Sequence, residues 1–311
     1  MSDVIVIGGG LSGLSAAWEL ERLGIAYTLI EVKPRLGGSI QTERVDGFVI
    51  DHGPFVLEKY GDWPFLPELG LQNNLTAIGR YRDGELVIFA AGTQTLVDAL
   101  ASRLTAPRML RMAVSSLGAI DGQRYGICLE NGVMLEARAI VIAVPARYAD
   151  HMLRTVAPEA ALRLSDYRYD PVVRVHLAFR RQDLPRDLPI PTGGLFKFAE
   201  AYVLPDRVPP DHALVRVGVR LNIDPAVATP EQALAAARRY FDVEPILARA
   251  HYWSEADPLT CYLPEHSANM DTVDTALPTG IALVGSDYRA RRLPDRVEQG
   301  RAAARKIVDA L

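Results

Sequence analysis

Residues 3–13 read Asp-Val-Ile-Val-Ile-Gly-Gly-Gly-Leu-Ser-Gly, a run of β-branched apolar residues that ends in a cluster of glycines. The run predicts a strand buried on both faces, because such strands are apolar throughout and do not alternate. Apolar residues then recur at helical spacing from Gly13 to Leu23, and Gly24 is suited to end that helix. Residues 27–30 predict a second buried strand. The order strand, helix, strand indicates a right-handed parallel β-α-β unit.

The glycines of this unit fit the fingerprint of a dinucleotide-binding loop. Gly8 permits the tight turn after the strand, Gly10 lets the backbone approach a pyrophosphate, and Gly13 lets the helix pack closely on the strand. Glu31 ends the second strand, where a carboxylate would accept hydrogen bonds from a ribose and would repel the 2′-phosphate of NADP. The alternative, a glycine turn in an ordinary α/β protein, is disfavoured by this full context.

Further strands of both kinds are predicted along the chain. Residues 140–144 and 281–284 are again apolar throughout, whereas residues 173–177 and 215–219 alternate apolar and polar side chains, and turn signals between residues 109 and 143 predict a β-meander. We therefore expect an α/β fold, in which a Rossmann-like nucleotide-binding domain with a parallel sheet and the meander carries an inserted substrate domain with a mixed or antiparallel sheet. The first domain would comprise residues 1–58, 90–146 and 275–311, and the second residues 59–89 and 147–274.

The composition disfavours several classes of protein. The 311 residues include 34 Lys and Arg against 38 Asp and Glu, a net charge of −4 without a basic run, so nucleic acid is not an expected partner. The two cysteines, Cys128 and Cys261, indicate reduced thiols and hence a cytoplasmic protein. No apolar run approaches the roughly 20 residues of a membrane span, and residues 1–7 lack the basic start of a signal peptide.

Additional segments carry a resemblance to a known family. Residues 35–38 read Arg-Leu-Gly-Gly, and residues 51–54 read Asp-His-Gly-Pro. Together with the glycine loop and Glu31, they resemble the flavin-containing amine oxidoreductases, which include monoamine oxidases, phytoene-type desaturases and protoporphyrinogen oxidases. Residues 140–146 and 284–300 look most like protoporphyrinogen oxidase.

The resemblance includes one departure in length. Residues 89–96 resemble the family's glycine-marked entry to the helix before the meander. The chain runs from residues 81–89 directly into residues 90–96, which indicates that the helical, membrane-docking insertion of the longer protoporphyrinogen oxidases is missing here. The resemblance therefore implies the family's cofactor more strongly than its tetrapyrrole substrate or membrane attachment.

The resemblance implies a bound FAD in extended form. Residues 285–288 hold no cysteine for a covalent link, so the FAD is expected to be non-covalent. On the adenosine side, matching positions imply contacts of Gly8, Gly10 and Gly13 with the pyrophosphate, of Glu31 with the ribose and of Val114 with the adenine. Along the phosphates and ribityl chain they imply contacts of Arg35, Gly37, Gly38 and Asp287. Gly53 and Pro54 would contact the isoalloxazine, and Val297, at the opening of the last helix, would lie at the flavin N1–C2=O edge. Their neighbours Gly9, Leu11, Ser12, Val32, Ser39, Phe55, Gly285 and Asp295 complete the expected set, although the family commonly has Arg or Lys where Ser39 stands.

Three residues are candidates for catalysis. Trp253 stands where the family often places a tryptophan near the flavin. Arg174 falls near the position at which amine oxidases have a lysine that holds a water at flavin N5, and His52 could bond flavin or substrate. An outward-facing arginine and a structural loop histidine are the alternatives for the last two. An apolar wall that excludes water is expected from Phe55, Tyr169, Phe196, Phe198, Tyr202, Trp253 and Tyr262, unless these aromatics only fill the core. The histidines lack metal-ligand spacing, so no metal site is expected.

The favoured function is an FAD-dependent oxidoreductase. It would remove a hydride from a small or medium organic molecule, in an amine, C–H/C–H or porphyrinogen-type oxidation, by transfer to flavin N5, and pass the electrons to oxygen or another acceptor. Two alternatives stay open, namely a non-redox flavoenzyme such as an isomerase or mutase, and an FAD-binding partner protein without turnover of its own. The sequence does not predict the substrate or the oligomeric state.

Overall fold

The centre of the molecule is a five-stranded parallel sheet. The computed structural model describes residues 2–122, 124–185, 193–204, 206–221, 223–255 and 257–311. Strand β1 (Val4–Ile7) lies in the middle of the sheet and is almost completely buried. On one side it pairs with β2 (Tyr27–Glu31), which pairs with β8 (Arg108–Leu110), and on the other with β12 (Ala139–Ile142), which pairs with β17 (Ile281–Leu283). The predicted parallel unit and buried strands are confirmed.

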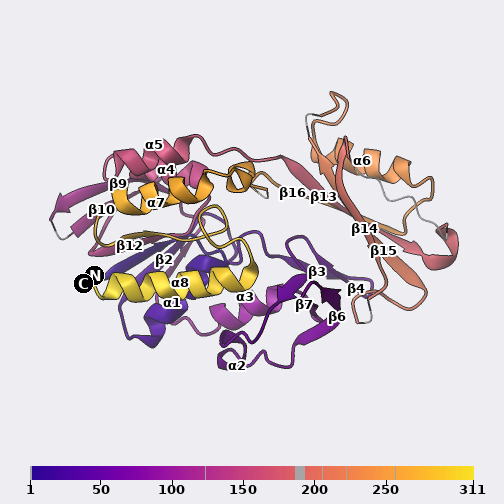
Figure 1. Cartoon of the computed structure of the whole chain (residues 1–311), viewed down its shortest axis with the longest axis horizontal. Helices are drawn as coiled ribbons and strands as arrows, with labels where there is room; N and C mark the ends of the chain where they lie inside the picture. Colours follow the sequence, from indigo (N-terminus) through magenta and orange to yellow (C-terminus); the bar gives the residue numbers. More distant parts are fainter. Residues whose placement is uncertain (1, 123, 186–192, 205, 222, 256) are drawn as a thin grey trace.

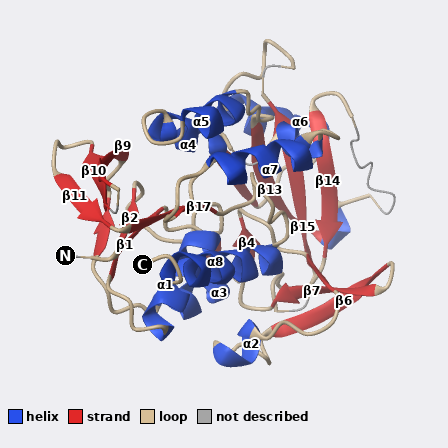
Figure 2. Ribbon diagram, turned by 60° about the vertical axis from the view of Figure 1, so that its left-hand side comes forward, coloured by secondary structure: helices blue, strands red, loops and turns tan. Residues whose placement is uncertain are grey.

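Helices cover both faces of this sheet (Figures 1 and 2). On one face lie α1 (Leu11–Arg22), α3 (Gln94–Ala101) and α8 (Leu293–Val308), whose buried side chains share a core with Val4 and Val6. On the other face lie α4 (Ala146–Leu153), α5 (Pro158–Ser165) and α7 (His266–Ala276), which share a core with Ile5 and Ile7. Because side chains alternate along β1, the two cores lie on opposite sides of one strand.

Small sheets extend this body. The predicted meander is confirmed as the antiparallel strands β9 (Val114–Asp121), β10 (Arg124–Leu129) and β11 (Met134–Ala137). Strands β3 (Thr42–Val45) and β4 (Phe48–Asp51) form a hairpin, and β5 (Leu57–Lys59), β7 (Gly84–Phe89) and β6 (Leu75–Tyr81) form a three-stranded sheet beside the short helix α2 (Phe65–Glu68). Strand β7 leads into α3 through residues 90–93 alone.

A four-stranded antiparallel sheet forms the other end of the molecule (Figure 1). Its order is β14 (Phe196–Tyr202), β15 (His212–Arg220), β13 (Val172–Arg180) and β16 (Leu247–Trp253). Val173, Val175 and Leu177 on β13 form one apolar core with helix α6 (Pro230–Tyr240). The intervening Arg174 and His176 belong to the opposite face and contact His52, which follows β4. The predicted antiparallel strands are confirmed, and each face of the sheet has a different chemistry.

Three features differ from the sequence-based expectation. Helices α4, α5 and α7 were not predicted, and none of them has a side-chain hydrogen bond that caps its N-terminus. They fall almost entirely within residues 147–274, yet they pack on the parallel sheet, so the division into two domains stays a prediction. The last helix begins at Leu293, so Val297 is its fifth residue and does not open it. No helix in the described segments has the length and apolar character that a membrane crossing requires.

Candidate functional site

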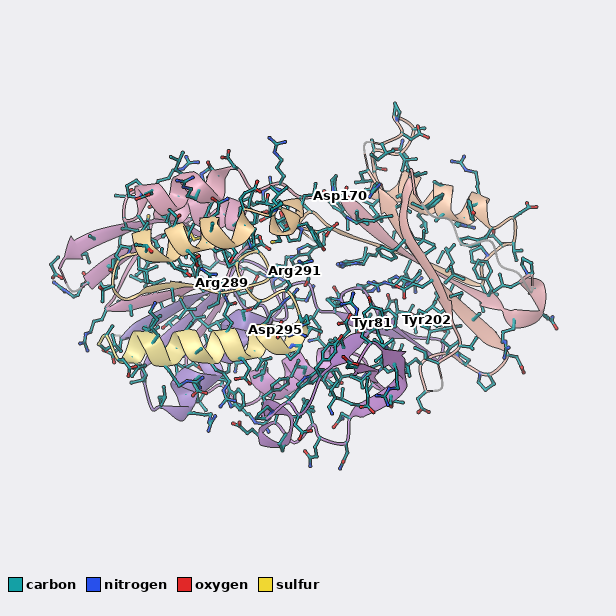
Figure 3. The ribbon with its side chains drawn as sticks, in the orientation of Figure 1. Tyr81, Asp170, Tyr202, Arg289, Arg291 and Asp295 are labelled. Carbon is teal, nitrogen blue, oxygen red and sulfur yellow. The ribbon has the colours of Figure 1, made fainter. Side chains whose placement is uncertain are left out.

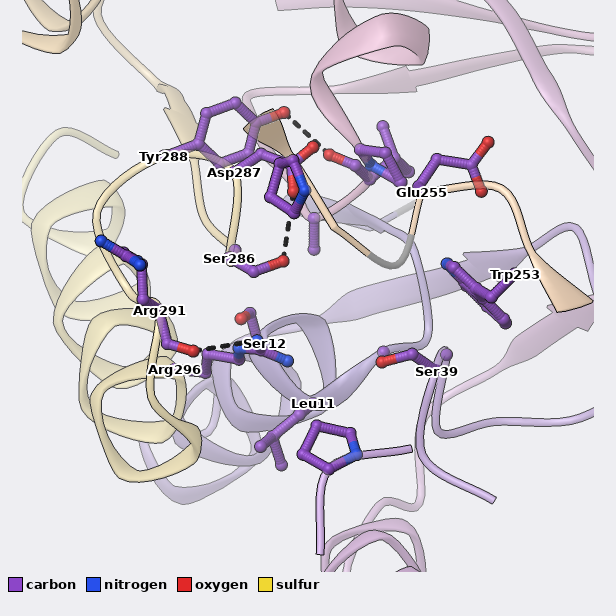
Figure 4. Close-up of a pocket in the computed structure, with 18 of the residues that line it drawn as sticks. Leu11, Ser12, Ser39, Trp253, Glu255, Ser286, Asp287, Tyr288, Arg291 and Arg296 are labelled. Carbon is purple, nitrogen blue, oxygen red and sulfur yellow. Dashed lines mark hydrogen bonds between the residues drawn. The ribbon is translucent and has the colours of Figure 1, made fainter. Parts of the chain in front are cut away.

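Two adjoining cavities lie at the carboxyl edge of the parallel sheet. Their volumes are about 200 and 370 Å³. The first, which lies toward α8, is drawn in Figure 4, and the second extends toward β2 and the meander. Both contain the segment that follows β12 and the glycines that follow β1, because parallel strands end at the same edge. Their shared lining residues are Gly10, Gly38, Ala143, Val144, Pro145, Trp253 and Glu255.

The glycine loop shapes the junction of the cavities. Gly8 has φ +105°, which other residues rarely adopt, and a Cβ on Gly13 would lie 1.9 Å from the Gly8 carbonyl oxygen. A Cβ on Gly10 would meet only Gly38 Cα, at 3.8 Å, so it would project into open space. Helix α1 starts after Gly10 with no side-chain cap and no acidic residue in its first turn. Its free N–H groups and positive dipole end therefore favour an anion at this point.

The second cavity combines apolar walls with one buried carboxylate. Glu31 is 6% exposed, and its oxygens accept hydrogen bonds from the backbone N–H groups of Gly9 at 2.6 Å and Lys33 at 2.8 Å. The remaining lone pairs of the carboxylate are available for a further donor. The apolar side chains around it are Ile7, Ile30, Val32, Met112, Val114 and Met152. This combination suits a flat heteroaromatic ring joined to a hydroxylated group.

In the first cavity, Asp287 fastens the floor. It is 3% exposed and accepts hydrogen bonds from the Ala146 N–H at 2.9 Å, from the Ser286 hydroxyl at 3.1 Å and from the Tyr169 hydroxyl. Burial raises the pKa of Asp287, while these donors oppose the rise. The neighbouring Tyr288 donates to the Val144 carbonyl at 2.7 Å, as Figure 4 shows. Asp287 therefore acts on the cavity by holding the segment after β12 in place.

Three guanidinium groups line the first cavity. Arg296, in the first turns of α8, donates to the carbonyls of Ala290 at 3.2 Å and Arg291 at 3.0 Å, and burial lowers its pKa. Arg291 lies at the same end of α8, the end nearest to the four-stranded sheet in Figure 3. Arg174 reaches the cavity from that sheet. The carboxylates of Glu255, Asp257 and Asp287 line the same cavity, so the guanidinium groups and the N-terminus of α1 favour negatively charged ligand groups only at their own positions.

Trp253 lies where the two cavities meet. The ammonium of Lys33 stands 3.3 Å from the centroid of its ring, a cation–π contact between the end of β2 and the end of β16. Burial lowers the pKa of Lys33. Two residues further on, Glu255 accepts a hydrogen bond from the Tyr148 hydroxyl at 2.8 Å. Contacts with Lys33, which follows β2, and with Tyr148 of α4 thus hold the end of β16 and the residues after it beside the two cavities.

Fifteen of the residues that the sequence predicted as site residues line these cavities. From the glycine loops and β2 they are Gly8, Gly10, Leu11, Ser12, Glu31, Val32, Gly37, Gly38 and Ser39, and from other elements Pro54, Val114, Arg174, Trp253, Gly285 and Asp287. They come from segments that are far apart in sequence. The fold therefore brings most of the expected residues together, although which of them contacts a ligand stays a prediction.

The remaining predicted residues lie outside the cavity walls, namely Gly9, Gly13, Arg35, His52, Gly53, Phe55, Asp295 and Val297. Arg35 donates to the carbonyls of Leu36, Gly38 and Ile40 and so braces the second glycine loop. Val297 is fully buried in the core. Asp295 pairs with Arg292 at 2.8 Å.

Most of the expected aromatic wall also lies elsewhere. Only Trp253 and Tyr262 line a cavity. Phe55 packs against Tyr202 with ring centroids 5.2 Å apart, and Phe196 packs against Tyr240 at 5.1 Å. The face of Phe198 receives the guanidinium of Arg216 at 5.2 Å, and Tyr169 is held by Asp287. These aromatics pack against neighbouring side chains outside the two cavities, and their place in a substrate wall stays a prediction.

Several lining residues were not predicted. Val144 and Pro145 had a signal, because they follow a predicted parallel strand whose end must lie beside Gly8. Lys33, Arg291 and Arg296 were missed although they lie beside or within segments that carry the family resemblance, because the resemblance assigned no contact to these positions. No group of His, Cys, Asp and Glu in the described segments is arranged to hold a metal ion.

Comparisons with known proteins agree with this geometry. The sequence profile of an NAD(P)-binding Rossmann-like domain matches residues 6–67, and that of the flavin containing amine oxidoreductases matches residues 61–308. Coproporphyrinogen III oxidase of Bacillus subtilis (strain 168) is 40% identical over 87 residues, which are 24% of this chain and 18% of that protein. Carotenoid 3,4-desaturase of Haloarcula japonica is 40% identical over 67 residues, which are 22% of this chain and 12% of that protein.

Solved structures show the same fold over the whole chain. A triple mutant of putrescine oxidase, made in a redesign of cofactor binding, has a TM-score of 0.72 and covers 99% of both chains at 15% identity. That identity is low enough for the likeness to concern the fold alone. The profile of the flavin family, by contrast, extends over most of the sequence, from before β6 to the end of α8. The chain therefore belongs to the family of flavin containing amine oxidoreductases.

Proposed function

We propose that the chain binds FAD non-covalently in the two cavities and acts as an FAD-dependent oxidoreductase. One observation carries the proposal: an uncapped helix N-terminus stands at the junction of an apolar cavity with a carboxylate and a cavity lined by guanidinium groups. A dinucleotide has the same order of parts, with an adenosine, a central diphosphate and a second ring. Membership of a flavin family and relatives named as oxidases and desaturases support the same assignment.

The residues present fit such a cofactor part by part. Gly10 leaves room for the diphosphate at the start of α1, where a side chain would intrude. Glu31 would accept the hydroxyls of the adenosine ribose, and Val114 would cover the adenine. Asp287, Arg296 and the N-terminal end of α8 would surround the ribityl chain and the flavin. When bound, the flavin supplies a hydride acceptor, and that chemistry belongs to the cofactor.

The chain's own residues would then bind, orient and enclose the substrate. Trp253 would contribute an apolar surface where the two cavities meet and so help to exclude water, as hydride removal requires. Arg174 would place a positive charge on the side of the four-stranded sheet. His52 does not line the cavity, so we propose that it positions Arg174, whose Nη1 donates to the His52 carbonyl at 2.8 Å.

The first experiment identifies the cofactor. Protein purified without added flavin should show flavin absorption, and acid denaturation should release FAD, rather than FMN, into the supernatant. A flavin that stays with the precipitate contradicts the non-covalent assignment. A colourless protein that takes up neither FAD nor FMN contradicts the proposed function altogether.

The second experiment tests turnover. Under anaerobic conditions, the bound flavin is mixed with amines, compounds that can lose hydrogen from adjacent carbons, and porphyrinogens. Bleaching by one class, followed by recovery when oxygen is admitted, would establish oxidation and name the acceptor. Turnover only with pre-reduced flavin and no net oxidation would instead establish a non-redox flavoenzyme. Failure of every class, together with a copurifying partner, would favour a flavin-binding partner protein.

A further inference from the structure

One face of the four-stranded sheet is rich in cations and imidazoles. In the register of the sheet, His176 on β13 stands between Arg216 on β15 and Arg249 on β16, and Arg174 stands beside His251. Since side chains two residues apart on a strand share a face, these five groups belong to the face opposite the one covered by α6. They point toward residues 43–55 and the first cavity, and not into the apolar core.

Nearby carboxylates form ion pairs with all of the arginines of this face except Arg174. Arg249 pairs with Glu43 at 2.7 Å and Arg216 pairs with Glu200 at 3.3 Å. Arg207, which joins the cluster from the loop before β15, pairs with Asp51. For Arg174, no carboxylate of the described residues lies within ion-pair distance, and its one hydrogen bond goes to the His52 carbonyl.

The position of Arg174 makes this lack of a partner informative. The side chain is half-buried, and it lines the first cavity from the sheet side. Burial and the neighbouring guanidiniums of Arg216 and Arg296 lower its pKa to about 10, so it stays charged at neutral pH. A partly buried cation without a counter-charge is costly, and where it lines a cavity a ligand can supply the counter-charge.

The groups behind Arg174 leave several hydrogen-bonding nitrogens without partners. Seven buried nitrogens there have no partner among the described residues, namely His52 Nδ1, His176 Nδ1 and Nε2, His251 Nε2, Arg207 Nε and Nη1, and Arg216 Nε. Buried polar atoms are seldom left unpaired, and the three guanidinium nitrogens can only donate, so acceptor atoms are missing beside them. The rings of His52 and His251 are stacked with centroids 4.8 Å apart, directly beside Arg174.

From these observations we propose that the substrate carries a carboxylate, which Arg174 binds at the sheet side of the first cavity. The proposal rests on the proposed function, because it names the class of molecule that this site would take. A guanidinium holds a carboxylate with two parallel N–H···O bonds, which a lysine cannot do. The carboxylate would supply the missing counter-charge and would draw the donor-rich face of the sheet into one hydrogen-bonded network.

The test compares ligands of one shape that differ in charge. Purified holoprotein is titrated with benzoate, benzamide and benzyl alcohol, and binding is followed by calorimetry and by the change in flavin absorption. We expect benzoate to bind at least tenfold more tightly than benzamide. In Arg174→Met this preference should fall to about one, and in Arg174→Lys it should be partly retained, because the charge remains and the fork geometry is lost.

The matched control is Arg180→Met, which removes an exposed arginine from the same strand, away from both cavities. It should keep the wild-type preference, which separates local binding from the net charge of the protein. Thermal unfolding of each variant checks that the fold is retained. If Arg174→Met is unstable, Arg174→Gln and Arg174→Lys carry the comparison.

Two results would overturn the proposal. The first is the absence of a benzoate preference in the wild type, or its persistence in Arg174→Met. The second is a change in FAD affinity or reduction potential in Arg174→Met with the preference unchanged, which would assign the cation to the cofactor. If the purified protein holds no flavin, the proposed function fails by itself, and calorimetry with the same three ligands still decides whether Arg174 binds a carboxylate.

Discussion

Gly10→Ala separates cofactor binding from folding. The residue has φ −74° and ψ 180°, a conformation that alanine adopts without strain, and the added methyl would meet nothing nearer than Gly38 Cα at 3.8 Å. The free energy of unfolding of the apoprotein should therefore fall by no more than about 1 kcal/mol, the loss of glycine's preference for the N-cap. The methyl would, however, occupy the space in which we place the diphosphate.

The expected loss of FAD affinity follows from the bonds that a displaced diphosphate gives up. A hydrogen bond from a backbone N–H to a charged group contributes about 1.5 to 3 kcal/mol. Losing one of them raises the Kd of FAD by roughly 10- to 150-fold. Apoprotein is titrated with FAD by calorimetry, and the unfolding of each apoprotein is measured in urea.

Two further alanine variants frame this measurement. Gly118→Ala adds the same methyl to β9, where nothing lies within 4 Å, and should leave FAD affinity unchanged. Gly13→Ala places the methyl 1.9 Å from the Gly8 carbonyl oxygen and should destabilise the fold itself. A stable Gly10→Ala protein with the FAD affinity of the wild type would refute the placement of the diphosphate.

Three further predictions concern stability. Asp51 and Arg207 are 2% and 0% exposed, so Asp51→Asn leaves a buried guanidinium unpaired and should lower the free energy of unfolding in urea by about 3 to 5 kcal/mol. Arg238→Met breaks the exposed pair with Glu244 and should lower it by less than about 1 kcal/mol, and equal losses in the two variants would contradict the assigned burial. Gly300→Ala puts a methyl 2.4 Å from the Ser12 carbonyl oxygen between α8 and α1, and it should lower the free energy of unfolding by about 1 to 3 kcal/mol, an expectation that an unchanged melting temperature would rule out. Burial, with His52 and the nearby cations Arg174, Arg35 and Lys33, lowers the pKa of His251 to about 4. Because the unfolded chain binds this proton near pH 6.5, the free energy of unfolding is highest above pH 6.5 and falls as the pH is lowered from 6.5 to 4. Melting temperatures should therefore decline less steeply for His251→Gln than for the wild type over this range, and parallel curves would exclude His251 as the cause.

The sequence predicted the part of the site that depends on local backbone geometry. The spacing of Gly8, Gly10 and Gly13 encodes one turn and one helix start, and Glu31 follows from the length of the unit. These requirements act within about thirty residues, so they leave a readable pattern. The same holds for the strands of the parallel sheet, whose burial on both faces makes their composition distinctive.

The parts that were missed depend on what packs against an element. Alternation on β13 indicated that Arg174 lies on the polar face of the strand. It did not indicate that residues 43–55 pack against this face or that Arg174 lines a cavity. Arg291 and Arg296 become cavity residues only because α8 returns to the start of α1. Helices α4, α5 and α7 have no side-chain N-cap bond, but α1, α3 and α8 lack one too and were predicted, so the missing cap does not explain why they were missed.

The contact between α1 and α8 has a consequence for synthesis on the ribosome. Glu19 of α1 and Arg301 of α8 form a buried ion pair although 282 residues separate them in the chain. At 5 to 20 residues per second, roughly 14 to 56 s pass between the translation of the two. During that interval the nascent helix that carries the glycine loop has no partner along one side and stays open to chaperones. The glycine loop therefore gains this partner helix only after about 280 further residues have been translated.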